Sequence, residues 1–186
     1  MTGLRQSGFS LLELLVALIV VVLVTSLVSL TVSSGGQDIK LQAQVRNLAE
    51  VANYALDEAQ MVGRDYGLLL LQDQVDGDTI YSYEWRERRQ GRWQTPESGK
   101  DVFATQALPA GLELQLELED SPTQEIGLAG SEEDAEPQVV FYSSGETSEG
   151  AIDIRRQQGG EILWRVKWDL LGRFTALRRG EELEDE

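Results

Sequence analysis

The chain has 186 residues, enough for one domain or one domain with an appendage, and carries 32 acidic against 16 basic residues, a formal net charge of −16. It contains neither cysteine nor histidine, which excludes a disulfide framework, the usual zinc sites and the Ser-His and Cys-His pairs of nucleophilic catalysis. A surface this acidic repels nucleic-acid phosphates and anionic lipids, and favours basic partners or divalent cations.

The N-terminal segment from Arg5 to Val32 is strongly apolar and contains one acid, Glu13. Its part from Leu14 to Val32 holds no charge and, as a helix, would be about 30 Å long, the thickness of a bilayer core. This run exceeds the apolar core of a secretory signal peptide, and no clear small-x-small cleavage site follows it. We therefore expect a transmembrane helix. Arg5, the sole basic residue before it, favours a cytoplasmic N-terminus and an external acidic part.

A second helical segment is expected after a flexible break at residues 33–36 (SSGG). Its apolar residues recur at alternating spacings of four and three: Leu41, Val45, Leu48, Ala52, Ala55 and Ala59. Its charged residues lie mainly off this stripe: Arg46, Glu50, Asp57 and Glu58. Gly63 predicts the C-terminal cap. We expect this helix to pack on a sheet; a coiled coil with another chain is the alternative.

From Tyr66 the hydrophobic pattern has a period of two, which is typical of strands. The candidate strands are YGLLLLQ (66–72), TIYSYEWRER (79–88), LELQLEL (112–118), QVVFYS (138–143), AIDIRR (151–156), EILWRVKW (161–168) and GRFTAL (172–177). Asp76-Gly77 predicts a tight turn between the first two. Because one long helix precedes only strands, we predict an α+β fold, with the N-terminal helix packed on an antiparallel β-sheet or β-sandwich head.

Two acidic stretches, residues 120–137 and the tail 181–186, predict solvated loops or disorder. Carboxylates gather at two places, Asp76 and Asp78 beside Gly77, and Glu132, Glu133, Asp134 and Glu136 in the acidic loop. Neither place has the twelve-residue calcium-loop pattern, and no spacing selects a catalytic pair of carboxylates. We therefore predict no enzymatic activity, no cofactor and no metal site; a calcium site in the acidic loops is the alternative.

The aromatic residues of the strands allow two interpretations. They are Trp85, Trp93, Trp164 and Trp168, with Tyr81 and Tyr83. We interpret them as packing in the core or at a sheet edge, and a carbohydrate or peptide platform is the alternative.

The stretch SGFSLLELLVALIVVVLV resembles the N-terminus of type IV pilins and pseudopilins: a leader ending in Gly8, then Phe9, then Glu13 as the fifth residue of the processed chain. The resemblance implies that a prepilin peptidase cuts between Gly8 and Phe9 and that Phe9 is N-methylated. Glu13 would then pair in a filament with the terminal amine of a neighbouring subunit, which offsets the cost of burying its charge and fixes the axial register. The alternative is an acid that reaches the membrane interface from a plain anchor.

Three further stretches resemble the minor pseudopilin H (GspH) family of type II secretion systems: GRDYGLLLLQD, LPAGLELQLELED and PQVVFYSSGETSEGAIDIRR. The resemblance implies a structural subunit at or near the tip of a periplasmic pseudopilus, and a β-sandwich head. Its partners would be the major pseudopilin, the tip minor pseudopilins, the prepilin peptidase and the inner-membrane secretion platform, and no nucleic acid.

The same resemblance implies a division of the chain. The expected parts are a leader (1–8), a single transmembrane helix in the bacterial inner membrane (9–33), a periplasmic half of the helix (34–63), a periplasmic head (64–180) with the acidic loop 120–137, and an acidic tail (181–186). The alternative is a minor pilin of a type IV pilus, including the kind that binds DNA. A DNA-binding head needs a basic face, and the densest basic cluster is Arg86, Arg88 and Arg89.

Overall fold

The computed structural model describes residues 11–97, 101–119, 121–124, 126–128 and 135–181, with the backbone alone for residues 24–35, 37 and 121–124. The chain divides into two compact units, Met1–Lys40 and Leu41–Glu186. Helix α1 (Leu11–Val62) begins in the first unit and ends in the second. The break predicted at residues 33–36 is wrong, because α1 continues through it. A helical glycine costs only about 1 kcal/mol relative to alanine and keeps its hydrogen-bond donor, so two glycines do not end a helix.

In the second unit, α1 packs on the sheets as predicted. The six residues of the apolar stripe are no more than 4% exposed. The buried face is wider than the stripe, since Ala49, Val51 and Leu56 are buried as well. Glu58, predicted to lie off the stripe, is also buried, and the Tyr54 hydroxyl donates a 2.7 Å hydrogen bond to its carboxylate. The stripe therefore faces the chain's own core.

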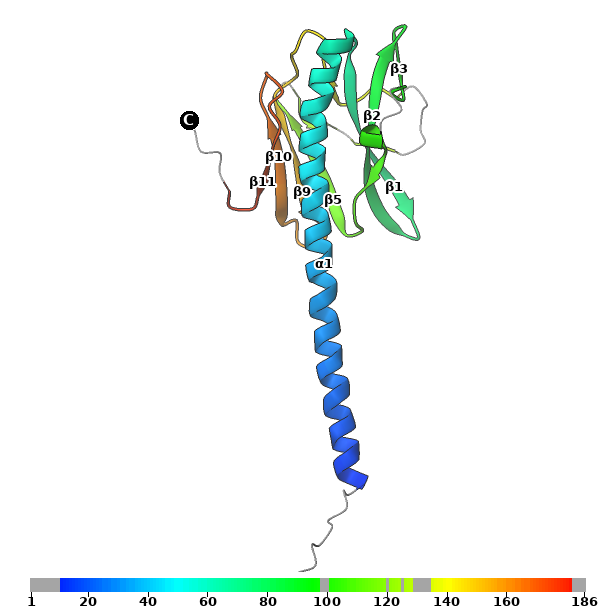
Figure 1. Ribbon diagram of the computed structural model, residues 1–186, viewed down its shortest axis with the longest axis vertical. Helices are drawn as coiled ribbons and strands as arrows, with labels where there is room; N and C mark the ends of the chain where they lie inside the picture. Colours follow the sequence, from blue (N-terminus) through cyan, green and yellow to red (C-terminus); the bar gives the residue numbers. More distant parts are fainter. Residues whose placement is uncertain (1–10, 98–100, 120, 125, 129–134, 182–186) are drawn as a thin grey trace, which may run out of the picture. The chain divides into compact units, whose positions relative to one another are not determined.

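The head contains two sheets (Figure 1). The first comprises β1 (Tyr66–Val75), β2 (Asp78–Arg89), β3 (Arg92–Gln94), β4 (Gln106–Ala107), β7 (Gly127–Leu128) and β8 (Val139–Phe141). The second comprises, in spatial order, β11 (Thr175–Arg178), β10 (Ile162–Trp168), β9 (Gly150–Arg156), β5 (Leu112–Leu118) and β6 (Ser121–Gln124). A short 3₁₀ helix, η1 (Asp101–Phe103), precedes β4. The strand pairs are antiparallel except for β1 with β7, so the first sheet is mixed and not purely antiparallel.

Strands β6 and β7 lie inside the stretch 120–137, where only loop was predicted. β6 pairs with β5, and β7 pairs with β1 through Leu71 and Gln72. Their sequences lack the apolar alternation of a buried strand, but a neighbouring strand supplies backbone partners regardless of side-chain type. The acidic residues 129–134 and the tail residues 182–186 lie outside the described residues.

The turn and cap predictions are confirmed. Asp76 and Gly77 both have positive φ angles, 54° and 90°, as a tight two-residue hairpin turn requires. Gly63 ends α1 with a φ of 69°, and its N–H donates to the Ala59 carbonyl at 2.9 Å.

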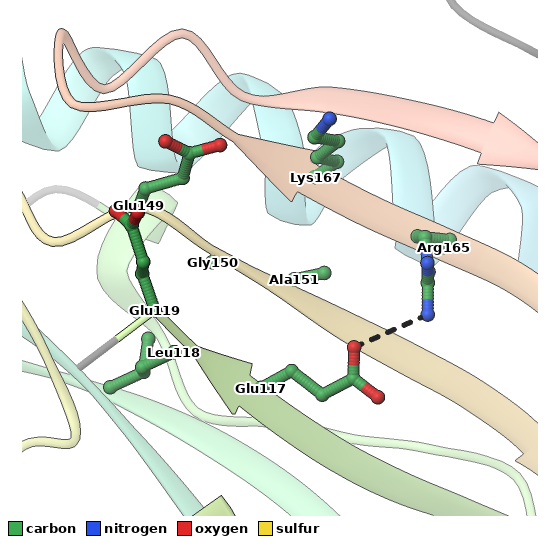
Figure 2. A pocket seen from close by; sticks show the side chains of 8 residues that line it. All are labelled: Glu117, Leu118, Glu119, Glu149, Gly150, Ala151, Arg165 and Lys167. Atoms are coloured by element: carbon green, nitrogen blue, oxygen red, sulfur yellow. Dashed lines mark hydrogen bonds and ion pairs between the residues drawn. The ribbon is translucent and has the colours of Figure 1, made fainter. Parts of the chain in front are cut away.

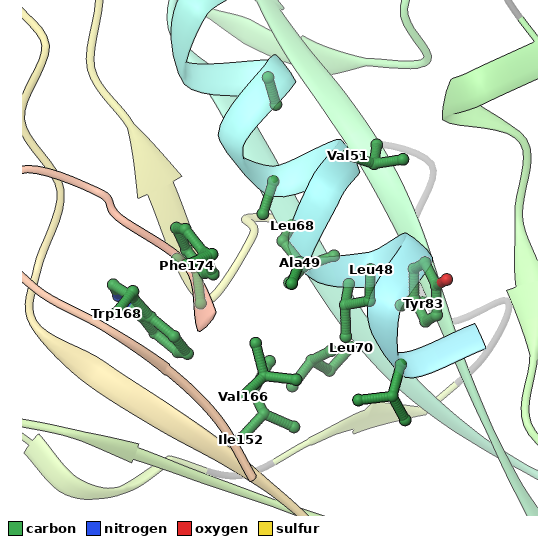
Figure 3. Packing of buried hydrophobic residues seen from close by; sticks show 14 of the residues in the cluster. Leu48, Ala49, Val51, Leu68, Leu70, Tyr83, Ile152, Val166, Trp168 and Phe174 are labelled. Carbon is green, nitrogen blue, oxygen red and sulfur yellow. The ribbon is translucent and has the colours of Figure 1, made fainter. Parts of the chain in front are cut away.

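The core lies where residues 41–62 of α1 meet both sheets (Figure 3). Leu48 of the helix, Leu70 and Tyr83 of the first sheet, and Ile152 and Val166 of the second belong to it. The Trp168 ring stacks on Phe174 at a centroid distance of 4.7 Å. All four tryptophans are at most 7% exposed, so the packing interpretation of the aromatic residues is confirmed.

Candidate functional site

Glu13 lies in the first turn of α1, among exposed leucines. The unsatisfied N–H groups at a helix N-terminus favour a negative charge there, so the helix itself accommodates this acid. Gly8 and Phe9, the predicted cleavage and methylation residues, lie outside the described residues.

The first part of α1 exposes an apolar surface on all sides. Between Leu11 and Leu23 every residue is exposed, and Glu13 is the one charged residue of this stretch. A helix that is apolar all round is expected to be covered by lipid or by other helices. Among the residues described with their side chains, no helix contains an 18-residue stretch apolar enough to cross a membrane. The predicted span from Leu14 to Val32 extends into residues 24–35, whose side chains are not described.

The junction between α1 and the head is fixed by a buried acid. Glu87 on β2 is 3% exposed and accepts a 2.7 Å hydrogen bond from Arg64, directly after the helix cap. This hydrogen bond and the charge of Glu87 raise the pKa of the Arg64 guanidinium. Arg89 lies 3.6 Å from the other oxygen of Glu87. The residue that follows the helix cap is therefore bound to β2, an inner strand of the first sheet.

The densest basic cluster of the sequence, Arg86, Arg88 and Arg89, is neutralised within the head. Arg86 pairs with Glu84 at 2.7 Å, and Arg88 approaches Asp65 at 3.6 Å. Arg88 also lies over the Trp93 ring, 5.8 Å from its centroid. Arg89 forms ion pairs with Glu87 and Glu97. These arginines therefore do not form a free basic face that could bind phosphates.

A charged cluster lies on the outer face of the second sheet. Asp153 on β9 has a fully buried side chain, although it points away from the core, because Arg155 and Arg165 cover it. Arg155 donates to it at 2.9 Å, and Arg165 also reaches Glu117 on β5 at 3.4 Å. Burial alone would raise the pKa of Asp153, but the hydrogen bonds and charges of Arg165 and Arg155 outweigh it and hold the pKa below its usual value.

Sequence reasoning missed this cluster. Asp153 occupies a polar position of an alternating strand, AIDIRR, which is the pattern of any solvent-facing residue. Strand register places Asp153 opposite Arg165 on one side and Gln115 on the other, and register cannot be read from composition.

Among the described residues, no group of three or more carboxylates is arranged to hold a metal ion. Asp76 and Asp78 flank a tight hairpin turn. The predicted acidic loop residues Glu132, Glu133 and Asp134 lie outside the described residues.

An apolar helix with an acid in its first turn, continuing into a helix that packs against a two-sheet head, defines a pilin-like protein. A family profile, "Prokaryotic N-terminal methylation motif", matches residues 3–30. A second, "Type II transport protein GspH", matches residues 44–172, well over half of the chain. The chain belongs to this GspH family, the minor pseudopilins of type II secretion systems.

Individual relatives agree with this assignment. The type II secretion system protein H of Aeromonas hydrophila is 29% identical over 186 residues, covering 97% of this chain and 98% of its own. That of Pseudomonas aeruginosa is 28% identical over 145 residues, covering 76% and 78%. The crystal structure of the minor pseudopilin EpsH from Vibrio cholerae superposes with a TM-score of 0.59 at 22% identity, covering 78% of this chain and 98% of that one. It shares the fold predicted for the head.

Proposed function

We propose that this minor pseudopilin is a structural, non-enzymatic subunit at or near the tip of a periplasmic pseudopilus. The chain is made as an inner-membrane precursor with a cytoplasmic N-terminus and a periplasmic head. A prepilin peptidase cuts it between Gly8 and Phe9 and methylates Phe9. The inner-membrane secretion platform then adds it to the other pseudopilins, both the major subunit and the tip minor subunits.

The observation that carries this proposal is the combination of Glu13 with an apolar helix surface. Residues Leu11 to Leu23 are exposed within the isolated chain, so their burial requires lipid or the helices of other subunits. Cleavage would create a cationic amine at Phe9, four residues before Glu13 in the sequence. Inside a helix bundle, an unpaired carboxylate is costly, whereas a carboxylate paired with a neighbour's amine is tolerated and sets the register between the subunits.

The arginine pairing described above weighs against the alternative, a minor pilin that binds DNA. Such a head needs uncompensated basic residues for the phosphates. Here the three arginines of the densest basic cluster already form ion pairs with Glu84, Glu87, Glu97 and Asp65. The genes beside this one provide an independent check: secretin and secretion ATPase genes support the proposal, and pilus retraction genes support the alternative.

Intact-mass measurement of the protein from its host tests the first step. The expected mass is that of a chain beginning at Phe9 and carrying one additional methyl group. Replacing Gly8 with a bulkier residue should leave uncut precursor in the membrane. A mature chain that begins at Met1, or near Gly35, would contradict the proposal.

A further inference from the structure

The outer face of the second sheet contains a pocket of about 480 Å³ (Figure 2). It lies where β5 ends, β9 begins and β10 ends, and its floor is Gly150 and Ala151. Ala151 is only 8% exposed, yet it lies outside the cluster of hydrophobic side chains packed between α1 and the two sheets. Position 150 requires glycine, since a Cβ there would lie 2.6 Å from the Glu117 carbonyl oxygen and 2.7 Å from the Trp168 ring.

The pocket carries uncompensated charges of both signs on its walls. Glu119 and Glu149 lie together at one end, where the Glu119 N–H donates to the Glu149 carbonyl at 3.1 Å. Lys167 lies on the β10 side and is exposed. Within the described part of the chain, none of these three side chains forms an ion pair. Glu117 and Arg165, by contrast, are already paired across the floor.

We propose that this pocket is a docking site for the head of a neighbouring pseudopilin, which presents a basic side chain to Glu119 and Glu149 and a carboxylate to Lys167. The inference rests on the proposed function, because it names the surface through which the assembled subunit selects its neighbour. Two adjacent carboxylates without a counter-charge repel each other, and a partner's cation relieves that cost.

The charge pattern favours a protein partner over other occupants. A bare metal ion would leave Lys167 unmatched, and no described carboxylate cluster has the arrangement of a metal site. A second copy of this chain would bring two strongly acidic heads together, since the net charge is −16. A heterologous head can instead match both ends of the pocket at once.

The absence of cysteine from the sequence allows a direct test in the full-length protein. Ala151→Cys places a single thiol on the pocket floor, where it can carry a photoreactive crosslinker in host cells that lack the native copy. Val20→Cys, in the exposed apolar part of α1, reports separately on incorporation among the helices of other subunits.

Pocket polarity is then reversed without changing the net charge, by combining Glu149→Lys with Lys167→Glu. The matched control combines Asp57→Lys with Arg92→Glu, two exposed positions outside the pocket. Tryptophan fluorescence checks that both double variants are folded. If the pocket swap unfolds, Lys167→Glu alone, at an exposed position, takes its place.

The expected result is a crosslink from Ala151→Cys to another pseudopilin. The pocket swap should reduce the crosslink yield about tenfold, which corresponds to about 1.4 kcal/mol of binding free energy. The control swap should leave the yield unchanged. The docking proposal is overturned by equal yields in both swaps, by crosslinking to a second copy of this chain, or by a yield that EDTA abolishes. It is also overturned if Val20→Cys crosslinks to other pseudopilins while Ala151→Cys does not. If neither reporter crosslinks, the proposed function fails as well.

Discussion

Arg165 holds Asp153 with two hydrogen bonds across neighbouring strands, from Nε to Oδ1 at 2.6 Å and from Nη2 to Oδ2 at 2.9 Å. The two residues are direct partners in the β9–β10 register. A bidentate guanidinium–carboxylate pair is both strong and geometrically specific. The pair therefore fixes β10 against β9 on the sheet face that forms the proposed docking site.

Asp153→Asn should destabilise the head by about 2 kcal/mol at neutral pH, because hydrogen bonds to a buried charge contribute roughly 1.5–3 kcal/mol. The pKa of Asp153 is lowered in the folded protein, so its stabilisation is present above the unfolded pKa and lost as pH falls through the folded pKa. Urea unfolding of the full-length protein in detergent, followed by tryptophan fluorescence at pH 7 and near pH 3, measures this.

The exposed Asp57→Asn variant is the control for that experiment and should change stability little at either pH. If Asp153→Asn lowers the free energy of unfolding equally at both pH values, the side chain acts through its shape and not through its charge.

Leu48→Asp should prevent the head from folding. Leu48 is 4% exposed at the centre of the helix–sheet interface, and burying an unpaired charge there costs several kcal/mol, much of the stability of a typical domain. Asn47→Asp, one residue earlier and exposed, is the matched control and should fold normally. Protease resistance and tryptophan fluorescence of the full-length protein in detergent measure whether the head folds. A folded Leu48→Asp head would mean that the stripe contacts another subunit.

Tyr83→Phe should leave the protein as stable as the parent or more stable. The hydroxyl is buried, no described residue hydrogen-bonds to it, and burial raises its pKa to about 12. Removing an unpaired buried hydroxyl has little cost. Because the folded pKa lies above the unfolded value of 10.0, the parent should lose stability as pH rises from about 10 to 12. The variant should lose this part of the alkaline slope, and unfolding curves at pH 9 and 11 compare the two.

Glu13→Leu should be processed normally and assembled poorly. In the proposed pathway a prepilin peptidase acts before the neighbour's amine is met, so cleavage would not depend on the proposed pairing. In the assembled bundle, loss of the carboxylate would leave that amine buried without a partner, at a cost of about 3–5 kcal/mol. Two measurements test this: the yield of crosslinks between processed Glu13→Leu and neighbouring pseudopilins, and the level of secretion in the same cells. Normal crosslinking and secretion would show that Glu13 is not required in this subunit.

Periodicity was sufficient to predict the parts of the fold that bury apolar side chains. The helix stripe, the alternation of β5 and the Asp76-Gly77 turn follow from side-chain chemistry within a few residues. The N-terminal motif was equally local, since Gly8, Phe9 and Glu13 lie within six positions.

The features that sequence reasoning missed depend on contacts between distant segments. Strand β7 pairs with β1 through the backbone, which leaves no apolar pattern to read. Asp153 is buried by arginines from its own strand and from the next, and Glu58 is covered by the fold around α1. In each case, strand register or packing determines the environment, and a polar residue in the sequence gives no sign of it.

The route from α1 into the head has a mechanical consequence. Three residues, 63–65, separate the end of the helix from β1, which pairs with β2 along its whole length, from Tyr66 opposite Glu87 to Val75 opposite Asp78. The chain reverses direction at residues 63–65, so that β1 runs opposite to α1 (Figure 1). Tension transmitted along residues 41–62 of α1 would therefore pull the start of β1 back over its own strand, and the β1–β2 rungs would be lost one at a time from Tyr66 onward. The Arg64–Glu87 ion pair lies at the point where this force enters and would have to break first. The rate of forced unfolding would then depend on this local pair and not on the equilibrium stability of the head alone.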